Sequence, residues 1–546
     1  MYRNITTYTK NNKQMIWIAT WDKKGNRVEE EHEIRPYLYI EDTAFKDSQW
    51  KSMYDKPLRF LDFNTSFERK EWIKTSLNIP LFEKFSPERQ YLIDAFCGKE
   101  RDNEFMKFPL RVYFIDIEVE VDAVFPEPSL AEYPINVISL YDTLTNTMHV
   151  WTYRKDISAC LTEEQEKKIK DEINSEYEKE LTVKIYKFDN EIKLLDDFLQ
   201  YWEKNIPDVV SGWNIDRFDI PYIINRIRKK LPEDFDKRLS PNYWHKFAIS
   251  TKKESYLKEL VMKYHIMGIS LCDYMNLYKK FTYSSQQSYK LDYIAKIEID
   301  RGKLDYYDLG YDSMRDFMQK DFATFVKYNI IDTILVKQID DSKKFIDLMR
   351  RICNMGLCPY ETIFKTTPYI LGMLCIEARK RGVKFLTDSN KGEEQIEEAD
   401  DGFEGAFVFD TIAGFYQNGV MSFDFNSLYP NTIATVNISP ETMVGKVVSE
   451  IGENKEDEIV IKKPNGQFVK MSKEKFDKLL EEKCTISAAN VLFVKPEIKR
   501  GLLPSFLIDM YDARKSLKNK AKKFKKTAHE LGEEIKELER QLAEMQ

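Results

Sequence analysis

Apolar and polar residues follow several different patterns along this chain, and each pattern predicts different elements. Short apolar runs at Met15–Trp21 and Tyr37–Ile40 indicate strands among the helical stretches of the first hundred residues. A strongly apolar run from Leu110 to Val121 is interrupted by acids, and alternating strand and helix signals follow it to about Asp341. Because strands that alternate with helices are typical of α/β domains, we expect an α/β fold here.

The rest of the chain shows other patterns. The acidic segment NKGEEQIEEADD at 390–401 predicts a linker or a surface crossing, and strand signals resume from Gly405. Charge, Gly and Pro are mixed over Gly445–Lys473, which predicts surface loops and hairpins. From Pro504 to Gln546 Pro and Gly are almost absent, and the spacing predicts one long helix.

Composition limits the class of protein. With 546 residues and 42% hydrophobic content, the chain has enough apolar material for several cores, and its length suggests roughly three or four domains. The 13% aromatic and 32% charged fractions exclude a disordered protein. The net charge of -7 gives no whole-chain signature of nucleic-acid binding, but such binding depends on where Lys and Arg cluster.

Targeting and ligand chemistry narrow the possibilities further. Met1–Ile16 lacks the pattern of a secretory signal and no apolar run reaches membrane-spanning length, so we expect a soluble, intracellular protein with no membrane contact. Seven cysteines without a CxxC pair and five histidines favour neither a disulfide framework nor a zinc site. Any catalytic metal should therefore be held by carboxylates, which favour Mg²⁺ or Mn²⁺.

Two acids stand in the first buried strand of the α/β region. In FIDIEVEV, Asp116 and Glu118 are two residues apart, so a strand directs both carboxylates to one face. Two like charges about 4 Å apart repel by about 4 kcal/mol at an effective dielectric constant of about 20, so the pair needs a counter-charge or a proton. A divalent metal would supply that charge, and an exposed strand end with solvated acids is the alternative.

Two later segments carry further candidates. In VVSGWNIDRFDIPYIINRI a short strand ends at a Gly-Trp-Asn turn and a helix begins near Asp219, with Pro221 in its first turn. Asp219 is either a functional carboxylate or a helix cap. In FVKYNIIDTILVKQ, Tyr328 and Asp332 lie at i and i+4 on one helix face, although an exposed Asp and a half-buried Tyr are also commonplace.

Taken in order, these segments resemble the three exonuclease motifs of family B DNA polymerases: DIE, then N-x-x-x-F-D from Asn214, then Y-x-x-x-D. The resemblance implies a ribonuclease-H-like fold with 3′→5′ proofreading activity by two-metal phosphodiester hydrolysis. It implies that Tyr328 helps to position the attacking water and that four carboxylates bind two Mg²⁺ or Mn²⁺ ions: Asp116, Glu118, Asp219 and Asp332. Two clamped metals can polarise the phosphate, activate water and stabilise the leaving oxygen.

Further along, VMSFDFNSLYPNTI resembles polymerase motif A of the same family. By this resemblance Asp424 binds both polymerase metals and Phe425 adds its main-chain carbonyl. Ser427 and Leu428 meet the triphosphate, and Tyr429 stacks under the sugar and excludes a 2′-hydroxyl. A buried, aromatic-rich strand and turn without chemistry is the alternative.

The final helix contains YDARKSLKNK, which resembles the first fingers helix and implies Arg514 and Lys518 as triphosphate contacts. The basic run around them could also be only a solvated face. The K-x-x-x-N-S-x-Y-G helix and the D-T-D-S turn of the family occur nowhere in the chain. One metal carboxylate of the polymerase site is therefore missing.

The overall pattern looks especially like polymerases of T4-type bacteriophages, as in GISLCDYMNLYKKFTYSSQQSYKLDYIA and VNISPET. This implies an N-terminal domain over 1–110 joined by 345–395, an exonuclease domain over 111–344, a partial α+β palm over 396–500 and a partial fingers helix over 501–546. The chain has Phe403-Glu404-Gly405-Ala406 where many family members carry Y-x-G-G. This difference leaves open how the exonuclease site is coupled to the polymerase site. The expected location is the cytoplasm of an infected bacterium.

Three functions fit these observations. In the first, the chain is the N-terminal subunit of a split polymerase that binds primer-template, single-stranded DNA and deoxynucleoside triphosphates. It then needs a complementary C-terminal chain, through which it would also meet a sliding clamp. A stand-alone exonuclease is the second, and a non-enzymatic nucleic-acid-binding assembly protein is the third. An artificial truncation would give the same sequence as a natural subunit.

The last helix also carries a candidate interface. Its apolar residues recur at alternating spacings of four and three, the heptad pattern of a coiled coil: Phe524, Ala528, Leu531, Ile535, Leu538, Leu542 and Met545. Charged residues flank this seam, so we expect it to pair with a helix of the complementary chain. Folding back on its own domain and forming homodimers are the alternatives.

Overall fold

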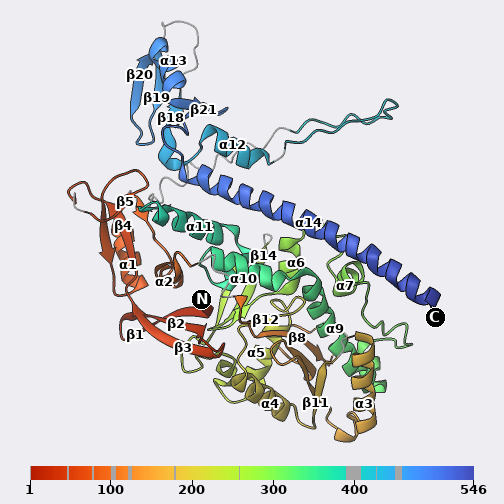
Figure 1. The fold of residues 1–546 in the computed structure, drawn as a ribbon. Helices are drawn as coiled ribbons and strands as arrows, with labels where there is room; N and C mark the ends of the chain where they lie inside the picture. Colours follow the sequence, from red (N-terminus) through yellow and green to blue (C-terminus); the bar gives the residue numbers. More distant parts are fainter. Residues whose placement is uncertain are drawn as a thin grey trace. The chain divides into compact units, whose positions relative to one another are not determined.

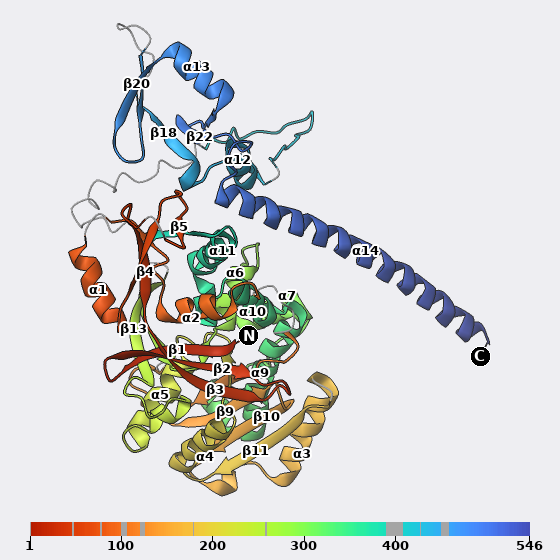
Figure 2. The ribbon, with the colours of Figure 1, turned by 60° about the vertical axis from the view of Figure 1, so that its left-hand side comes forward.

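The computed structural model describes residues 2–45, 48–76, 79–99, 106–120, 126–177, 180–256, 259–388, 408–425, 427–448 and 458–545. They form two compact units of mixed α and β structure (Figures 1 and 2). The first unit contains Met1–Tyr37, Asp62–Thr75 and Phe85–Met373, and the second contains Leu38–Leu61, Ser76–Lys84 and Leu374–Gln546. The predicted linker at 390–401 and the segment Phe403-Glu404-Gly405-Ala406, with the expected start of the palm, lie outside the described residues.

Among the described residues, the first unit holds three sheets. An antiparallel sheet has the order β1-β2-β3, and β13 and β14 form a hairpin. A mixed sheet of six strands has the order β11-β10-β9-β8-β12-β15, in which β8 is antiparallel to β9 and parallel to β12. The strands are β1 (Tyr2–Lys10), β2 (Lys13–Trp21), β3 (Arg27–Ile34), β8 (Val112–Val119), β9 (Ile135–Asp142), β10 (Thr147–Tyr153), β11 (Thr182–Phe188), β12 (Val209–Ser211), β13 (Ile249–Tyr256), β14 (Glu259–Ile266) and β15 (Ser270–Leu271).

Helices cover both faces of the six-stranded sheet. Apolar residues of α4 and α5 share one core with β8, β9 and β10, and α9 packs against β8 and β9. The helices of this unit are α1 (Ser66–Thr75), α2 (Pro87–Phe96), α3 (Glu163–Glu172), α4 (Glu191–Lys204), α5 (Asp219–Lys230), α6 (Tyr274–Phe281), α7 (Leu291–Ile299), α8 (Met314–Lys320), α9 (Phe322–Lys343), α10 (Phe345–Met355) and the first half of α11 (Thr366–Lys380). The α/β fold expected after Leu110 is confirmed.

The second unit combines strands from distant parts of the chain. Strands β16 and β17, at 383–388, pair with β5 and β7 from the first hundred residues. A separate five-stranded sheet has the order β20-β19-β18-β22-β21 and contains the hairpin expected within 445–473. The elements are β4 (Tyr37–Glu41), β5 (Lys51–Ser52), β6 (Leu58–Asp62), β7 (Leu81–Phe82), β16 (Val383–Lys384), β17 (Leu386–Asp388), α12 (Leu428–Val436), β18 (Met443–Val447), β19 (Glu458–Lys462), β20 (Phe468–Ser472), α13 (Lys473–Glu482), β21 (Cys484–Ile486), β22 (Val491–Val494) and α14 (Leu502–Met545).

Two expectations for the second half have opposite outcomes. The long final helix is confirmed as α14, which begins two residues before Pro504. The strand signal after Gly405 is wrong for 408–425, where the described chain is extended but exposed and not paired into a sheet. A strand needs a neighbour for its N–H and C=O groups, and apolar alternation alone does not provide one.

None of the helices in the described part of the chain combines the length and the apolar composition that crossing a bilayer requires.

A buried ion network joins the N-terminal sheet to the six-stranded sheet. The carboxylate of Asp208, just before β12, accepts hydrogen bonds from Arg3 at 2.7–3.0 Å and from Arg27 at 2.7 Å. The main-chain N–H of Arg111, just before β8, donates to the same carboxylate at 2.8 Å. Asp208 therefore holds β1 against the starts of β8 and β12, two neighbouring strands that precede residues of the site described below.

We predict that Asp208→Ala lowers the free energy of unfolding of the first unit by about 3–5 kcal/mol, because it leaves two guanidinium groups without their buried counter-charge. Urea denaturation followed by far-ultraviolet circular dichroism measures this change. Asp189→Ala is the matched control, since Asp189 makes an exposed ion pair with Lys193 and should change stability by less than about 1 kcal/mol. Equal effects of the two substitutions would contradict a stabilising role for the network.

Candidate active site

Strand β8 separates apolar from acidic side chains. Ile115, Ile117 and Val119 belong to the core shared with α4 and α5. Asp116 and Glu118 alternate with them and so point to the opposite face, against which α9 packs. The predicted placement of both carboxylates on one face of a strand is confirmed.

The Gly-Trp-Asn turn brings Asp219 to the same strand. Strand β12 ends at Ser211, opposite Phe114, and beyond this pairing the N–H of Ile117 donates to Asp219 Oδ1 at 3.1 Å. Gly212 permits the close approach, because a Cβ there would lie 2.4 Å from the carbonyl oxygen of Ile115. Asp219 is the first residue of α5 and Phe218 is its N-cap, so the helix-cap alternative for Asp219 is wrong.

Helix α9 supplies the facing side chains. Tyr328 and Asp332 lie one turn apart, as the sequence predicts, and Asp332 is only 2% exposed. Asn329 lies between them and donates from Nδ2 to Asp116 Oδ2 at 2.5 Å. This amide bridge fixes α9 to β8 and was not expected from the sequence.

Three of the four predicted carboxylates converge on one point, and the fourth lies beside them. One oxygen each of Asp116, Glu118 and Asp332 lies within 4.8 Å of the others, a spacing at which one cation can meet all three. Asp219 is placed beside them by its bond to Ile117 but lies outside that group of three. The structure thus brings together three of the four predicted metal ligands and holds the fourth next to them.

A lysine that sequence reasoning missed completes the site. Lys303 lies between α7 and α8, and its main-chain N–H is fixed by Asp292 Oδ1 at 2.8 Å. Its ammonium group forms an ion pair with Asp332 and donates to the hydroxyl of Tyr328 at 3.3 Å. In the sequence, Lys303 stands 25 residues before Tyr328 in a loop without periodicity, so only the fold reveals its place.

Crowding and burial make this cluster electrostatically strained. Burial raises the pKa of Glu118 to about 8 and that of Asp219 to about 7. Burial also raises the pKa of Asp116 far above its ordinary value, and the neighbouring carboxylates of Asp219 and Asp332 raise it further. For Asp332 burial again raises the pKa, but the ammonium group of Lys303 opposes this effect. The four carboxylates can all be ionised only if nearby positive charge stabilises them, and Lys303 supplies one positive charge.

The donor set suits a hard divalent cation. Its ligand atoms are carboxylate oxygens, which Mg²⁺ and Mn²⁺ prefer. In addition, Asp332 Oδ1 is buried and has no hydrogen-bond partner among the described residues. A bound cation would satisfy this oxygen and stabilise the ionised carboxylates against the burial and repulsion that raise their pKa values, so the residues fit the metal expected from the sequence.

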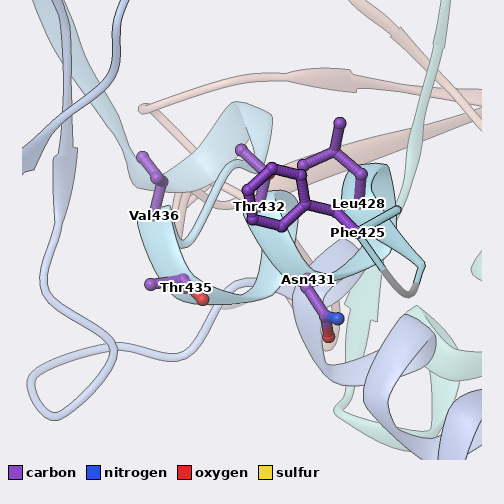
Figure 3. Close-up of a pocket in the computed structure, with 6 residues that line it drawn as sticks. All are labelled: Phe425, Leu428, Asn431, Thr432, Thr435 and Val436. Atoms are coloured by element: carbon purple, nitrogen blue, oxygen red, sulfur yellow. The ribbon is translucent and has the colours of Figure 1, made fainter. Parts of the chain in front are cut away.

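The predicted polymerase residues occupy the second unit and form no comparable cluster. Asp424 and Phe425 lie in the exposed extended segment, and Ser427 is the N-cap of α12 in a left-handed conformation with φ of 54°. Leu428 and Tyr429 are exposed on the first turn of that helix. Figure 3 shows the ring of Phe425 over one face of α12, where it borders a pocket of about 270 Å³.

Helix α14 is anchored beside α12. Asn437, directly after α12, donates to the carbonyl oxygens of Val494 and Lys499 at 2.6 and 2.8 Å and accepts from Gly501 N–H at 2.8 Å. Arg514 and Lys518 lie on α14 with exposed side chains. Their predicted role as triphosphate contacts stays a prediction, as do the roles of Asp424, Ser427, Leu428 and Tyr429.

Comparison with known proteins gives consistent matches. The exonuclease domain model of DNA polymerase family B matches residues 58–294, and the DNA polymerase family B model matches residues 365–539. The DNA-directed DNA polymerase of Escherichia phage RB69 is 32% identical over 436 residues, and that of Enterobacteria phage T4 is 30% identical over 444 residues. Each alignment covers 78% of this chain and 46% of the relative.

A more distant relative is the DNA polymerase catalytic subunit of Human herpesvirus 7 (strain JI), 25% identical over 348 residues, which are 62% of this chain and 31% of the relative. The chain spans about half the length of the phage polymerases it matches. Two models of the same family match successive parts of the chain. The matched ranges include the first two segments that resemble exonuclease motifs and the segment that resembles motif A, whereas Tyr328 and Asp332 lie between the two ranges. This protein therefore belongs to DNA polymerase family B.

Proposed function

We propose that the chain is a 3′→5′ DNA exonuclease and the N-terminal part of a split family B DNA polymerase. The observation that carries the exonuclease proposal is the convergence of the partly buried Asp116 and Glu118 with the buried Asp332, with Asp219 and Lys303 beside them. Two ions of Mg²⁺ or Mn²⁺, when bound by these carboxylates, would polarise the scissile phosphate and lower the pKa of a bound water.

The chain's own residues then have separate tasks. Asp116, Glu118 and Asp332 would hold the metal ions, and Asp219 keeps its position by accepting a hydrogen bond from Ile117 N–H. Burial raises the pKa of Tyr328, so its hydroxyl keeps its proton and can donate a hydrogen bond to the attacking oxygen or the phosphate. Lys303 positions that hydroxyl and can neutralise charge that develops on the phosphate.

The direct test is digestion of single-stranded DNA by the purified chain. An oligonucleotide labelled at its 5′ end should shorten one nucleotide at a time from the 3′ end in Mg²⁺, and EDTA should stop the reaction. An oligonucleotide blocked at the 3′ end should be resistant. Cleavage from the 5′ end or within the strand would contradict the proposed polarity.

For the polymerase half, we assign residues 1–110 with 345–395 to an N-terminal domain, 111–344 to a ribonuclease-H-like exonuclease domain, 396–500 to a partial palm and 501–546 to a partial fingers helix. Pairing of the 383–388 strands with β5 and β7 supports the return of the chain to the N-terminal domain. A second polypeptide would bring the missing motifs and a sliding-clamp contact, and the assembled enzyme would bind primer-template and deoxynucleoside triphosphates.

The exposed apolar seam of α14 supports the proposal that a second polypeptide binds this chain. The described side chains at Phe524, Leu531, Ile535 and Leu538 are between 53% and 73% exposed. The heptad spacing also continues one repeat toward the N-terminus from Phe524, through the exposed Leu517 and Ala521. Leu542 and Met545 belong to the same helix, but their side chains lie outside the described ones.

We predict that replacing Leu531 and Ile535 with Asp abolishes assembly with the complementary polypeptide, because two carboxylates buried without partners cost several kcal/mol. Analytical ultracentrifugation of the mixed chains measures assembly. Asn519→Asp with Lys526→Asp is the matched control, since both residues are exposed on the opposite face of the helix. Unchanged assembly of the seam variant would show that the chains meet elsewhere, and loss of a homodimer instead would identify the seam as a self-association surface.

A further inference from the structure

An exposed aromatic and basic surface lies outside the carboxylate cluster. In the segment 241–247, directly before β13, the side chains of Tyr243, Trp244 and Phe247 are 60%, 48% and 61% exposed. The residues from Pro241 to Lys253 include Lys246, Lys252 and Lys253 but neither Asp nor Glu. Three large aromatic side chains so close together on a surface are more than the scattered exposure that soluble proteins normally show.

Contacts to the N-terminal sheet hold these rings in place. Tyr8 of β1 packs edge-on against Trp244 with ring centroids 5.2 Å apart, and Lys10 of the same strand lies 5.7 Å above the Trp244 ring. Lys246 lies 5.5 Å from the ring of Phe247. The backbone is fixed by Ala248 N–H, which donates to His245 O at 3.1 Å, and by Met267 N–H, which donates to Ala248 O at 2.8 Å. The rings are therefore presented on an ordered surface at little further entropic cost.

The same surface continues into a cavity of about 790 Å³ that Tyr8, Phe247, Ser250, Lys252 and Lys70 of α1 help to line. This volume is within the range of sites that hold a nucleotide-sized group. Two acids, Glu88 and Glu361, also line it. Glu361 is already engaged, because it accepts from the N–H of Leu271 and lies 3.2 Å from His265 Nδ1.

The charges around the surface favour an anionic strand. Lys10, Lys70, Lys246 and Lys253 make no ion pair with any described residue. The acids of β3 belong to the strand beyond β2, and Glu33 among them is paired with Lys13. Glu31 lies close enough to Tyr8 to add to the rise in the pKa of its hydroxyl that burial causes, so one acid approaches the surface from this sheet. Lysines alternating with exposed rings are the combination by which proteins bind single-stranded nucleic acid, since the rings stack on bases and the ammonium groups follow the phosphates.

We propose that this surface, formed by Lys10, Tyr243, Trp244, Lys246, Phe247 and Lys252, is a second binding site for single-stranded DNA, separate from the carboxylate cluster. Bases stack on Trp244 and Phe247, and the phosphates contact the lysines. The cavity beside Phe247 seats one nucleotide of the strand. The binding measurement below does not depend on whether the carboxylate cluster is catalytically active, whereas the trinucleotide comparison rests on the proposed exonuclease function.

The test measures fluorescence anisotropy of a labelled oligothymidylate of about 20 nucleotides with the full chain in EDTA, which stops digestion. Trp244→Ala with Phe247→Ala should weaken affinity by about tenfold or more, as expected for the loss of base stacking. Lys246→Gln with Lys252→Gln should weaken it and reduce the slope of log affinity against log salt by about 1.4, or about 0.7 for each lost phosphate contact. Tyr283→Ala and Lys167→Gln, exposed residues elsewhere in the first unit, are the controls.

A trinucleotide substrate separates this site from the carboxylate cluster. It should be digested in Mg²⁺ equally well by wild type and by all four variants, because it is too short to occupy both places. Wild-type affinity and salt slope in both double variants would overturn the proposal. A loss of trinucleotide digestion as large as the loss of affinity for the long strand would also overturn it. So would a loss of affinity that is confined to duplex DNA. Intact DNA binding with lost assembly of the complementary polypeptide would instead make the surface a protein interface.

Discussion

Asp116→Ala is expected to slow removal of 3′ nucleotides from single-stranded DNA by about two orders of magnitude or more. The substitution removes one of three converging carboxylates and also the acceptor of Asn329, so both the charge and the attachment of α9 to β8 are lost. Asp219→Ala should have an effect of the same order, because Asp219 is the predicted fourth ligand. Rates are measured by gel electrophoresis of 5′-labelled oligonucleotides at saturating Mg²⁺.

Two comparisons make this result specific. Asp171→Ala removes an exposed acid of α3 in the same unit and should leave the rate unchanged. Tyr328→Phe should be milder than either carboxylate variant, since it removes a hydroxyl group but no predicted metal ligand. Digestion at the wild-type rate by folded Asp116→Ala would sink the assignment of the cluster.

The second large effect concerns synthesis. The chain alone is expected to incorporate no nucleotides, because Asp424 lies in an exposed segment and the D-T-D-S motif that would supply a second carboxylate is absent from the sequence. Primer extension on a defined template measures this. Addition of a polypeptide that carries K-x-x-x-N-S-x-Y-G and D-T-D-S should restore extension.

Variants of the exposed segment identify the source of that activity. Asp424→Ala should abolish extension by the assembled enzyme and leave the exonuclease rate unchanged. Asp410→Ala, an acid in the same segment, is the matched control and should support normal extension. Template-directed extension by the chain alone, free of contaminating polymerase, would refute the requirement for a second polypeptide.

The geometry of the carboxylate cluster was largely predictable because its residues stand at fixed places on regular elements. The two-residue spacing of Asp116 and Glu118 fixes their common face once β8 is a strand, and the four-residue spacing of Tyr328 and Asp332 does the same on α9. Lys303 was not predictable in this way. It reaches Asp332 from an irregular loop held by Asp292, and neither contact follows from a local period.

The region after Gly405 was harder to predict from the sequence. Alternating apolar residues after Gly405 indicate strands, but pairing partners must come from other segments, and 408–425 meets none among the described residues. The long helix was predictable because its hydrogen bonds are local. The hydrogen bonds of Asn437 that anchor the start of this helix were not predictable. Local periodicity thus predicted elements, and contacts distant in sequence decided how these elements are held.

The network around strand β1 also constrains the order in which the protein can fold during synthesis. Arg3 meets Asp208 across 205 positions, and the hydroxyl of Tyr2 donates to the carbonyl oxygen of Cys358 across 356 positions. Asp208 and Cys358 are therefore made long after β1 itself has left the ribosome. Strand β1 can pair with the adjacent β2 early, but its buried contacts with Asp208 and Cys358 can form only late in synthesis, so the apolar side chains that they cover stay exposed until then.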